Sequence, residues 1–455
     1  MNASIGRIVY LAGFAVALGT GTGHSQDFFR EFGPSRSSAG FGPVMPSPYA
    51  YEEASPSGLR SLTPMNESEE IDKYNFAVGP VRFSLAAGLG AEFNDNITLS
   101  ENNRESDIIL RPFIGLDAAW RISELNTLRF SLGASYAKYL NHSEFDSEGI
   151  LLSPTSELAL TFQIGPVKLT VRDRLSYQED AYDVPQLSNV AVYRRWENQI
   201  GAQADWQINQ YVDISAGYDH YNLWPKDDEF SSEERSIDTI FIKPGFQIIP
   251  PVKVGLNASY SFINFETGER QDADSIMVGP FVEWQISDFT NLYLEAGYQQ
   301  LQYDGASTFD DAFFSELDEE ERALFRDEED SNSYYVKFEI NNRPTENFRH
   351  RVSGSKTAEI GFGSNFYDLY HVEYSAEWKL FPKTQLAPTV FWEYYESSGL
   401  VSEEATRFGA ALALRHDLTN SITLGLDYRF LIKDSNIEGS DYYQNLAFLS
   451  VYYKF

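Results

Sequence analysis

An alternation of apolar and polar residues with period two runs through most of the chain. Between residues 252 and 262, for example, Val254 and Leu256 lie on one phase, and Lys253 and Asn257 lie on the other. Alternation over ten or more residues predicts a β-strand with one apolar and one polar face. Strands in soluble sandwiches have about five or six residues, whereas tilted strands of about ten residues cross a membrane. The pattern therefore predicts strands long enough to span a bilayer.

About 18 such segments lie between residues 79 and 455, joined alternately by short turns and longer polar loops. Bacterial outer-membrane barrels have an even number of antiparallel strands, with short periplasmic turns and long extracellular loops. An even number places both ends of the barrel on the periplasmic side. Because an open sheet edge cannot be satisfied in lipid, we expect a single all-β, antiparallel, up-and-down transmembrane barrel over residues 76–455.

Strands that lead into a short turn end in an aromatic residue, a polar residue and then Ile or Leu. Amphipathic rings concentrate at membrane–water interfaces, so these aromatics predict a ring at the periplasmic interface. Duplication of an ancestral hairpin would explain the same repeat. The expected interface aromatics are Trp120, Phe162, Trp206, Phe246, Trp284, Phe338 and Trp378.

The N-terminal region has the layout of a secretory signal. Arg7 precedes an apolar run over residues 8–18, which is followed by small and polar residues. That run would span only about 16 Å as a helix, roughly half of a bilayer core. We expect a cleaved signal peptide at 1–25, then a flexible periplasmic tail rich in Pro, Ser and Gly at 26–75.

The chain ends on its apolar phase, with Tyr453 and Phe455 as the last two members. A terminal Phe preceded by alternating apolar residues resembles the signal read by the barrel assembly machinery of the outer membrane. We therefore expect that machinery and outer-membrane lipid as partners, and the Gram-negative outer membrane as the location.

Composition excludes several other classes of function. The chain has 67 acidic and 35 basic residues and a net charge of −32, which argues against nucleic acid as a partner. It has no Cys and only six His, so we expect no cofactor or metal. The Asp219–His220 pair lacks further catalytic partners, and we expect no enzymatic activity. The oligomeric state is left open.

The polar phase of the expected strands carries many basic residues, which we expect to face the lumen. One interpretation is a wall of salt bridges that holds a wide barrel in shape. The other is a selectivity surface whose arginines favour anionic solutes. The expected pore-lining residues are Arg82, Arg111, Arg121, Arg129, Lys168, Arg172, Arg174, Arg195, Arg349, Arg351, Arg407, Arg415 and Arg429. Aromatics on the same phase are expected to fill the wall or to stack sugar rings: Phe113, Tyr139, Phe281, Tyr293 and Phe391.

Two features leave alternatives open. Asp173 falls on the apolar phase, where a charge at mid-bilayer is costly, so either a bulge shifts the phase or Asp173 lies near an interface. The acidic loop 304–330 is interpreted either as an amphipathic helix that constricts the mouth or as a loop that shields the surface.

One local motif carries a family resemblance. Residues 92–97 (Glu-Phe-Asn-Asp-Asn-Ile) end the first expected strand, and residues 107–112 (Asp-Ile-Ile-Leu-Arg-Pro) open the second. This hairpin resembles the β-barrel porin-2 family of Gram-negative bacteria, which includes barrels encoded with exopolysaccharide biosynthesis genes. The resemblance implies an outer-membrane barrel that conducts polysaccharide or small solutes, and it assigns no catalytic residue.

These observations favour a porin-like channel for passive diffusion of small solutes, anionic or sugar-like. The alternatives are an exopolysaccharide export barrel and a closed structural or adhesive barrel with acidic surface loops.

Overall fold

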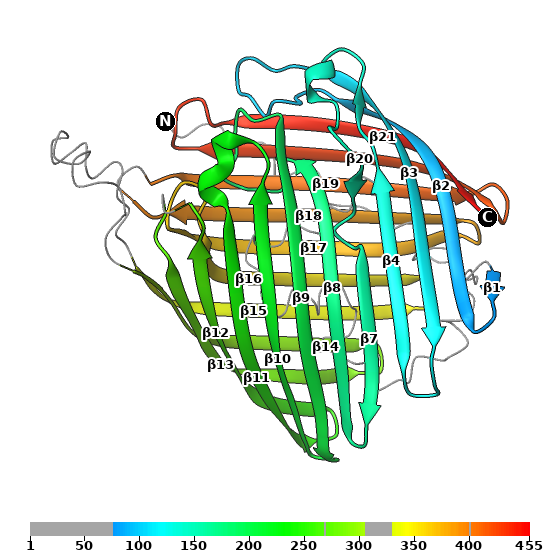
Figure 1. The fold of residues 1–455 in the computed structure, drawn as a ribbon, viewed down its shortest axis with the longest axis vertical. Helices are drawn as coiled ribbons and strands as arrows, with labels where there is room; N and C mark the ends of the chain where they lie inside the picture. The colour runs from blue at the N-terminus through cyan, green and yellow to red at the C-terminus, as the bar shows by residue number, and fades with distance from the viewer. Residues whose placement is uncertain (1–75, 268–269, 305–329, 400–401) are drawn as a thin grey trace.

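The computed structural model describes residues 76–267, 270–304, 330–399 and 402–455. These residues form an antiparallel sheet of 21 hydrogen-bonded strands. The sheet closes on itself, because β2 (Val81–Asn94) pairs on one side with β3 (Asp107–Arg121) and on the other with β21 (Tyr442–Lys454). Figure 1 shows the blue N-terminal strands beside the red C-terminal strands at this seam.

The other strands follow in chain order around the barrel. They are β1 (Phe76–Val78), β4 (Thr127–Ser135), β5 (Lys138–Tyr139), β6 (Leu151–Leu152), β7 (Glu157–Ile164), β8 (Val167–Asp180), β9 (Val192–Asn209), β10 (Val212–Pro225), β11 (Arg235–Ile249), β12 (Val252–Phe265), β13 (Ala273–Ser287), β14 (Thr290–Tyr303), β15 (Ser331–Thr345), β16 (Phe348–Ile360), β17 (Phe366–Phe381), β18 (Thr384–Ser397), β19 (Glu404–Asp417) and β20 (Ile422–Ser435). Two short 3-10 helices, η4 (Ser143–Phe145) and η5 (Asp228–Glu233), lie in loops.

The barrel wall has 18 strands. Both β4 and β5 pair with β3, and both β6 and β7 pair with β4, so each of these pairs is one interrupted strand of the wall. The short β1 is only a hairpin partner of β2. The predicted closed barrel and its strand number are confirmed.

The two faces of the wall divide as the alternation predicts. On β12 the apolar Leu256 is 44% exposed on the outside, whereas Asn257 beside it is 0% exposed on the inside. The outer surface is thus a band of apolar side chains, and the polar side chains line the interior.

The connections also alternate in length. The β7–β8 turn consists of Gly165 and Pro166, and Gly165 has a φ of 58°, a left-handed conformation that suits glycine. Val81 pairs with Trp120 beside the short β3–β4 turn, and Lys454 pairs with Ala86 near the same end. Both ends of the barrel therefore lie on the side of the short turns.

The predicted interface aromatics lie on the outer face near the short turns. Trp120 and Trp206 pair with Val81 and Val167, which are the first residues of their strands, and both rings are exposed. Phe246 and Trp284 are likewise exposed. Phe162, Phe338 and Trp378 share this outward phase but are half-buried.

Asp173 points outward without any bulge. The register of β8 is continuous through Asp173 on both sides, against β7 and against β9. Its carboxylate Oδ1 accepts a 2.7 Å hydrogen bond from Asn198 Nδ2 on the neighbouring strand. The bulge explanation is therefore wrong, and the outward carboxylate is paired with an amide.

Among the described residues, no helix has the length and apolar character needed to cross a bilayer. The predicted signal peptide and tail, residues 1–75, lie outside the described part of the chain.

Candidate functional site

A loop between β8 and β9, residues 181–191, runs into the barrel and docks on the opposite wall. Arg407 Nη2 on β19 donates a 2.9 Å hydrogen bond to the carbonyl oxygen of Tyr182. Tyr395 on β18 donates to the carbonyl of Pro185 at 3.2 Å. Since β8 and β9 lie far around the barrel from β18 and β19, this loop crosses the lumen.

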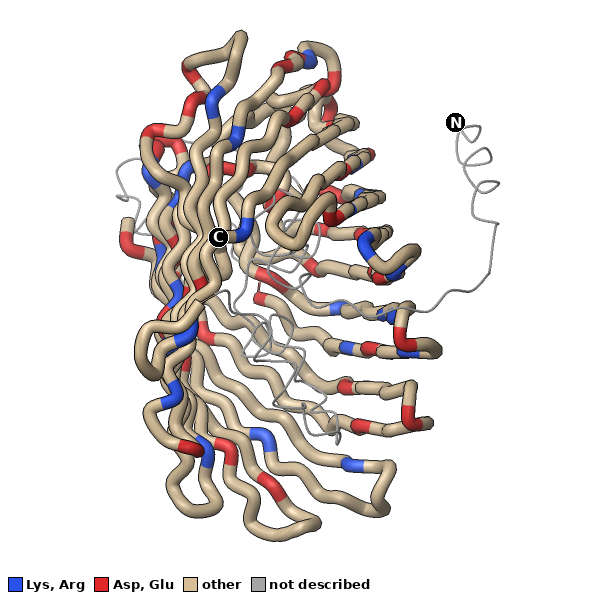
Figure 2. Tube along the Cα trace, turned by 90° about the vertical axis from the view of Figure 1, so that its right-hand side faces the viewer, with Lys and Arg blue, Asp and Glu red and all other residues tan. Residues whose placement is uncertain are grey.

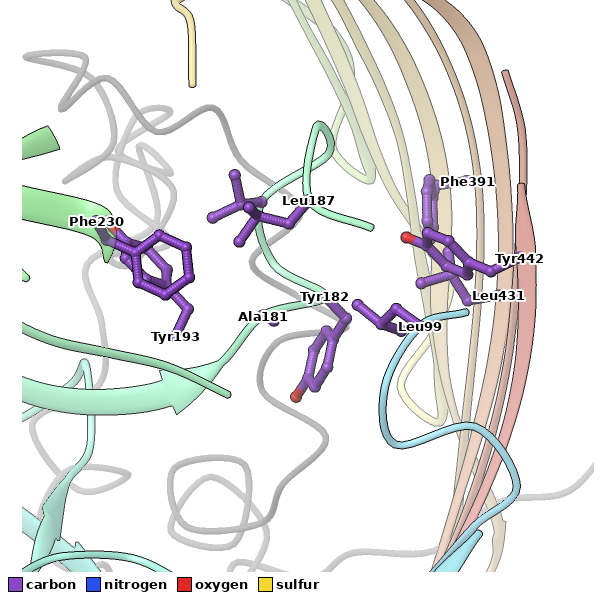
Figure 3. Close-up of a cluster of buried hydrophobic side chains, with 10 residues drawn as sticks. Leu99, Ala181, Tyr182, Leu187, Tyr193, Phe230, Phe391, Leu431 and Tyr442 are labelled. Atoms are coloured by element: carbon purple, nitrogen blue, oxygen red, sulfur yellow. The ribbon is translucent and has the colours of Figure 1, made fainter. Parts of the chain in front are cut away.

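The docked loop is anchored by apolar side chains. Figure 3 shows Tyr182 and Leu187 of the loop between Tyr193 and Phe230 on one side and the wall residue Leu431 on the other. Ten buried residues make up this cluster: Leu99, Ala181, Tyr182, Val184, Leu187, Tyr193, Phe230, Phe391, Leu431 and Tyr442. Removing this apolar surface from water stabilises the docked position of loop 181–191. A polar loop would gain no such stabilisation.

Neighbouring loops hold the far end of the crossing. The Gln186 side chain accepts a 2.6 Å hydrogen bond from Phe362 N and donates one of 3.3 Å to Ser364 Oγ. Ser188 Oγ donates a 2.9 Å hydrogen bond to the carbonyl of Ser440. Three loops therefore meet within the mouth of the barrel.

The wall under the loop is basic. The Arg429 guanidinium lies 3.6 Å from the centre of the Tyr182 ring, a cation–π geometry. Asp183 of the loop interacts electrostatically with Arg195, Arg407 and Arg429. An acidic loop residue thus faces arginines of the wall across the narrowed lumen.

The environment of Asp183 disfavours the charged form of its carboxyl group. Its Oδ1 is shielded from solvent and makes no hydrogen bond. Burial, reinforced by the charge of Asp180, raises the pKa of Asp183 to about 7, although the three arginines oppose the shift. The docked loop therefore carries a carboxyl group that titrates near neutral pH.

Most of the predicted pore-lining residues form ion pairs with acids on the same inner face. Figure 2 shows Lys and Arg interspersed with Asp and Glu along the wall. The pairs join Arg111 to Glu92 (2.8 Å), Arg172 to Asp219 (3.2 Å), Arg174 to Glu157 (2.6 Å), Arg195 to Glu197 (2.7 Å), Arg351 to Glu373 (3.2 Å), Arg407 to Glu393 (3.2 Å), Arg415 to Asp427 (2.7 Å), and Arg349 to Glu377. Salt bridges therefore connect side chains along the interior, as the first interpretation predicts. Arg429 differs from these arginines in donating a 3.1 Å hydrogen bond to Gln444.

The remaining predicted residues lie toward the short turns. Arg82, Arg121 and Arg129 belong to the inward phase of β2, β3 and β4 and are exposed, and Lys168 of β8 is half-buried. The basic residues are therefore most accessible in the half of the lumen away from the docked loop.

The inward aromatics fill the wall. Phe281 lies over Gly255 and Phe391 over Gly409, each pair facing across neighbouring strands. A Cβ on Gly409 would lie 1.8 Å from Phe391 Cε1, so only glycine admits the ring here. Phe113 and Tyr139 are likewise buried, and Tyr293 stacks on Phe281 with ring centres 6.1 Å apart. These contacts favour the interpretation as filler over exposed platforms for sugar rings.

The Asp219–His220 pair is split between the two faces. Asp219 points inward to Arg172, whereas His220 Nδ1 lies 2.8 Å from Asp238 Oδ1 on the outer face. The two side chains cannot act on one substrate. Within the described ranges, no three His, Asp or Glu side chains gather as a metal-binding group.

The resemblance motif has a structural role at the seam. Asn96 Nδ2 donates 2.9 Å hydrogen bonds to the carbonyls of Ser100 and Tyr443, and Glu92 pairs with Arg111. The motif therefore folds the first loop and joins the first wall strand to the last.

From the sequence, loop 304–330 was open to two interpretations, a helix that constricts the mouth or a loop that shields the surface, and residues 305–329 lie outside the described part of the chain. The crossing by residues 181–191 was not predicted. The available signal was composition: Tyr182, Val184 and Leu187 are unusually apolar for a connection expected to face water.

No protein-family model and no curated protein matches this sequence. Among solved structures, it is similar to OpdK of Pseudomonas aeruginosa with vanillate, at 8% identity and a TM-score of 0.43, covering 82% of this chain and 99% of that one. It is also similar to OccK2 (OpdF) of Pseudomonas aeruginosa in complex with glucuronate, at 9% identity and a TM-score of 0.45, covering 84% and 100%. A BenF-like porin from Pseudomonas fluorescens Pf-5 has 8% identity and a TM-score of 0.45, covering 83% and 100%. Since these values are low, the barrel assignment rests on the strand register described above, and the porin-2 resemblance stays a prediction.

Proposed function

We propose that this protein is a porin-like channel of the Gram-negative outer membrane through which small solutes diffuse passively. The observation that carries the proposal is the loop 181–191, which crosses the lumen and narrows a barrel whose outer surface is apolar. A wall that closes without a lipid-exposed edge suits a bilayer. A narrowed polar interior suits selective passage of small molecules.

Anionic solutes are the favoured class. Beyond the docked loop, the lumen presents the exposed arginines Arg82, Arg121 and Arg129, and Arg349 has a side chain that is 51% exposed. Cations fixed at a narrow passage raise the local concentration of anions and lower that of cations.

Export and assembly complete the proposal. Residues 1–25 direct secretion, Tyr453 and Phe455 form the signal for the barrel assembly machinery, and the outward aromatics near the short turns mark the periplasmic interface. No cofactor takes part.

The test is planar-bilayer recording of the chain refolded from Gln26. We expect a steady conductance with anion preference, weakened when the exposed Arg82, Arg121 and Arg129 are changed to Gln. A matched control changes the exposed Lys226 and Lys383 to Gln and keeps the preference. A folded barrel without conductance would contradict the channel.

The resemblance of the first hairpin supports a second candidate, export of exopolysaccharide. A polymer would need the loop 181–191 to leave the lumen. Deleting the protein would then stop polymer from reaching the cell surface without changing uptake of small solutes, the reverse of the result expected for a diffusion channel.

A further inference from the structure

The short strand β1 gives the direction from which the N-terminal tail reaches the barrel wall. It pairs antiparallel with β2, with Phe76 opposite Phe83 and a tight turn at residues 79–80. The chain that precedes Phe76 therefore lies farther from the short turn than β1 itself does. It cannot continue along β2, because Phe455 N already donates a 3.1 Å hydrogen bond to the carbonyl oxygen of Leu85.

The outer face beside β1 does not suit the segment that precedes this strand. Phe76 and Val78 are 43% and 63% exposed, so the outer surface here is apolar. Residues 67–72 of the tail carry four carboxylates, those of Glu67, Glu69, Glu70 and Asp72. Charged side chains and unpaired backbone groups are costly in contact with lipid. The lumen is the polar side of the wall at this point.

Three exposed arginines face the lumen beside β1. Ala77 of β1 lies opposite Arg82 of β2. Ala119 of β3 lies between Arg82 and Arg129 of β4 in the register of the sheet. Arg121 is the next inward position of β3 toward the short turn, and all three arginines are exposed. Strand spacing places their Cα atoms within about 10 Å of one another. We call Arg82, Arg121 and Arg129 the arginine cluster.

The next inward acids along the wall have other partners. Asp117 of β3 accepts a 2.6 Å hydrogen bond from Ser131. Glu157 of β7 acts on Arg129 but pairs with Arg174 at 2.6 Å. On the described strands β2, β3 and β4, the inward positions between Asp117 and the short turns include the arginine cluster and no acid. This sector of the wall therefore has a surplus of positive charge.

The tail segment before β1 matches this surplus in charge and in reach. Residues 67–72 carry four acids, and Lys73 is the one base between them and β1. Asp72 lies five residues before Ala77, which is opposite Arg82. An extended chain covers about 3.3–3.6 Å per residue, so five residues span up to about 17 Å. That reach exceeds the width of the arginine cluster.

We propose that residues 67–72 of the N-terminal tail dock on the arginine cluster, inside the short-turn end of the lumen. This inference rests on the proposed function and adds a regulation of the same channel. The docked carboxylates would accept charge-assisted hydrogen bonds from the guanidinium groups. The docking surface belongs to three of the 18 wall strands, so the tail changes the selectivity of the current without blocking it. By neutralising the arginines, the tail lowers the preference for anions.

Introduced cysteines test the position of the tail, since the chain has no Cys of its own. S68C lies within the acidic segment, and A119C lies on the inner face among the arginines. A118C, one position away on the outer face, is the matched control. We expect S68C to form a disulfide with A119C in the refolded barrel and not with A118C. A disulfide with A118C, or with neither cysteine, overturns the docking.

The second measurement is the chloride-to-potassium permeability ratio of single channels at low salt. The variant E67Q/E69Q/E70Q/D72N removes the charge of the acidic segment. We expect it to raise the ratio by about threefold, because fixed charges in a cleft change local ion concentrations by about tenfold or more. At 1 M salt the screening length falls to about 3 Å, and the difference from the wild type should shrink.

The matched control D27N/E31Q/E52Q/E53Q removes the same number of charges from the earlier part of the same tail. It should leave the permeability ratio unchanged. An equal rise in both variants, or no rise in either, overturns the proposal. A heat-dependent shift in gel mobility verifies that each variant is folded.

A folded wild-type barrel without conductance contradicts the proposed function instead. The disulfide between S68C and A119C can still form in such a barrel, so it tests the docking independently of conductance. The two failures are therefore distinguishable.

Discussion

The side chain of Asp95 accepts two hydrogen bonds from Asn445, which join the first strand of the barrel wall to the last. Asp95 Oδ1 accepts from the backbone N–H of Asn445 at 2.6 Å, and Oδ2 accepts from Asn445 Nδ2 at 2.7 Å. Asn445 also accepts a 2.6 Å hydrogen bond from Tyr428. One carboxylate thus fastens the seam at the end where the long loops begin.

Replacing Asp95 by Ala should weaken the closed barrel. The variant loses two partly buried hydrogen bonds to a charged group. Each loss lowers the free energy of unfolding by at most about 1.5–3 kcal/mol. The measurement is the urea midpoint of unfolding, followed by gel mobility. The exposed loop residue Asp228 provides the control, and an equal midpoint for D95A and D228A would refute the role of the seam contact.

Adding a methyl group at Gly409 should destabilise the wall through Phe391. The new Cβ would lie 1.8 Å from the ring, so the ring must leave its place. Overpacking of this kind typically costs about 1–3 kcal/mol. In unfolding measurements, F391L should cost less in the G409A background than alone. Additive effects of the two changes would contradict the contact.

Channel conductance should depend on pH through Asp183. The pKa of this carboxyl is about 7 in the docked loop, against an ordinary value of 3.8, so the protonated form docks more stably. Docking therefore strengthens as the pH falls below 7, and the gain is complete below about 4. We expect lower single-channel conductance at pH 5 than at pH 8. D183N should remove this dependence, and D228N should retain it.

Removing the Tyr182 ring should loosen the loop. The ring contacts Arg429 and belongs to the buried cluster that anchors the crossing. Loss of a large buried side chain typically costs about 3–5 kcal/mol. We expect Y182A to show larger and noisier single-channel currents. The control is Y211A, an exposed tyrosine at a short turn, and identical currents in both variants would count against the anchor.

The wall was predictable from the sequence because its signal is local. Alternation such as Val254, Lys253, Leu256 and Asn257 depends only on neighbouring residues, and it predicts the strand number and both faces. The pairing of strands adds little uncertainty, since consecutive strands in a barrel are neighbours.

The interior was less predictable because its contacts are remote in sequence. Tyr182 is hydrogen-bonded by Arg407, which lies more than two hundred positions further along the chain, and no sequence pattern around Tyr182 identifies Arg407 as its partner. The ion pairs of the inner face depend on register, which a one-residue slip would change. The inward-facing residues were therefore predictable from the sequence, whereas the contacts between them were not.

The crossing of loop 181–191 has a consequence for assembly. Its anchors on β18, β19 and β20 lie more than two hundred residues beyond the loop in the chain, so the loop has nothing to dock on until those strands have joined the wall. The loop therefore takes its place across the lumen only after the C-terminal strands are in position.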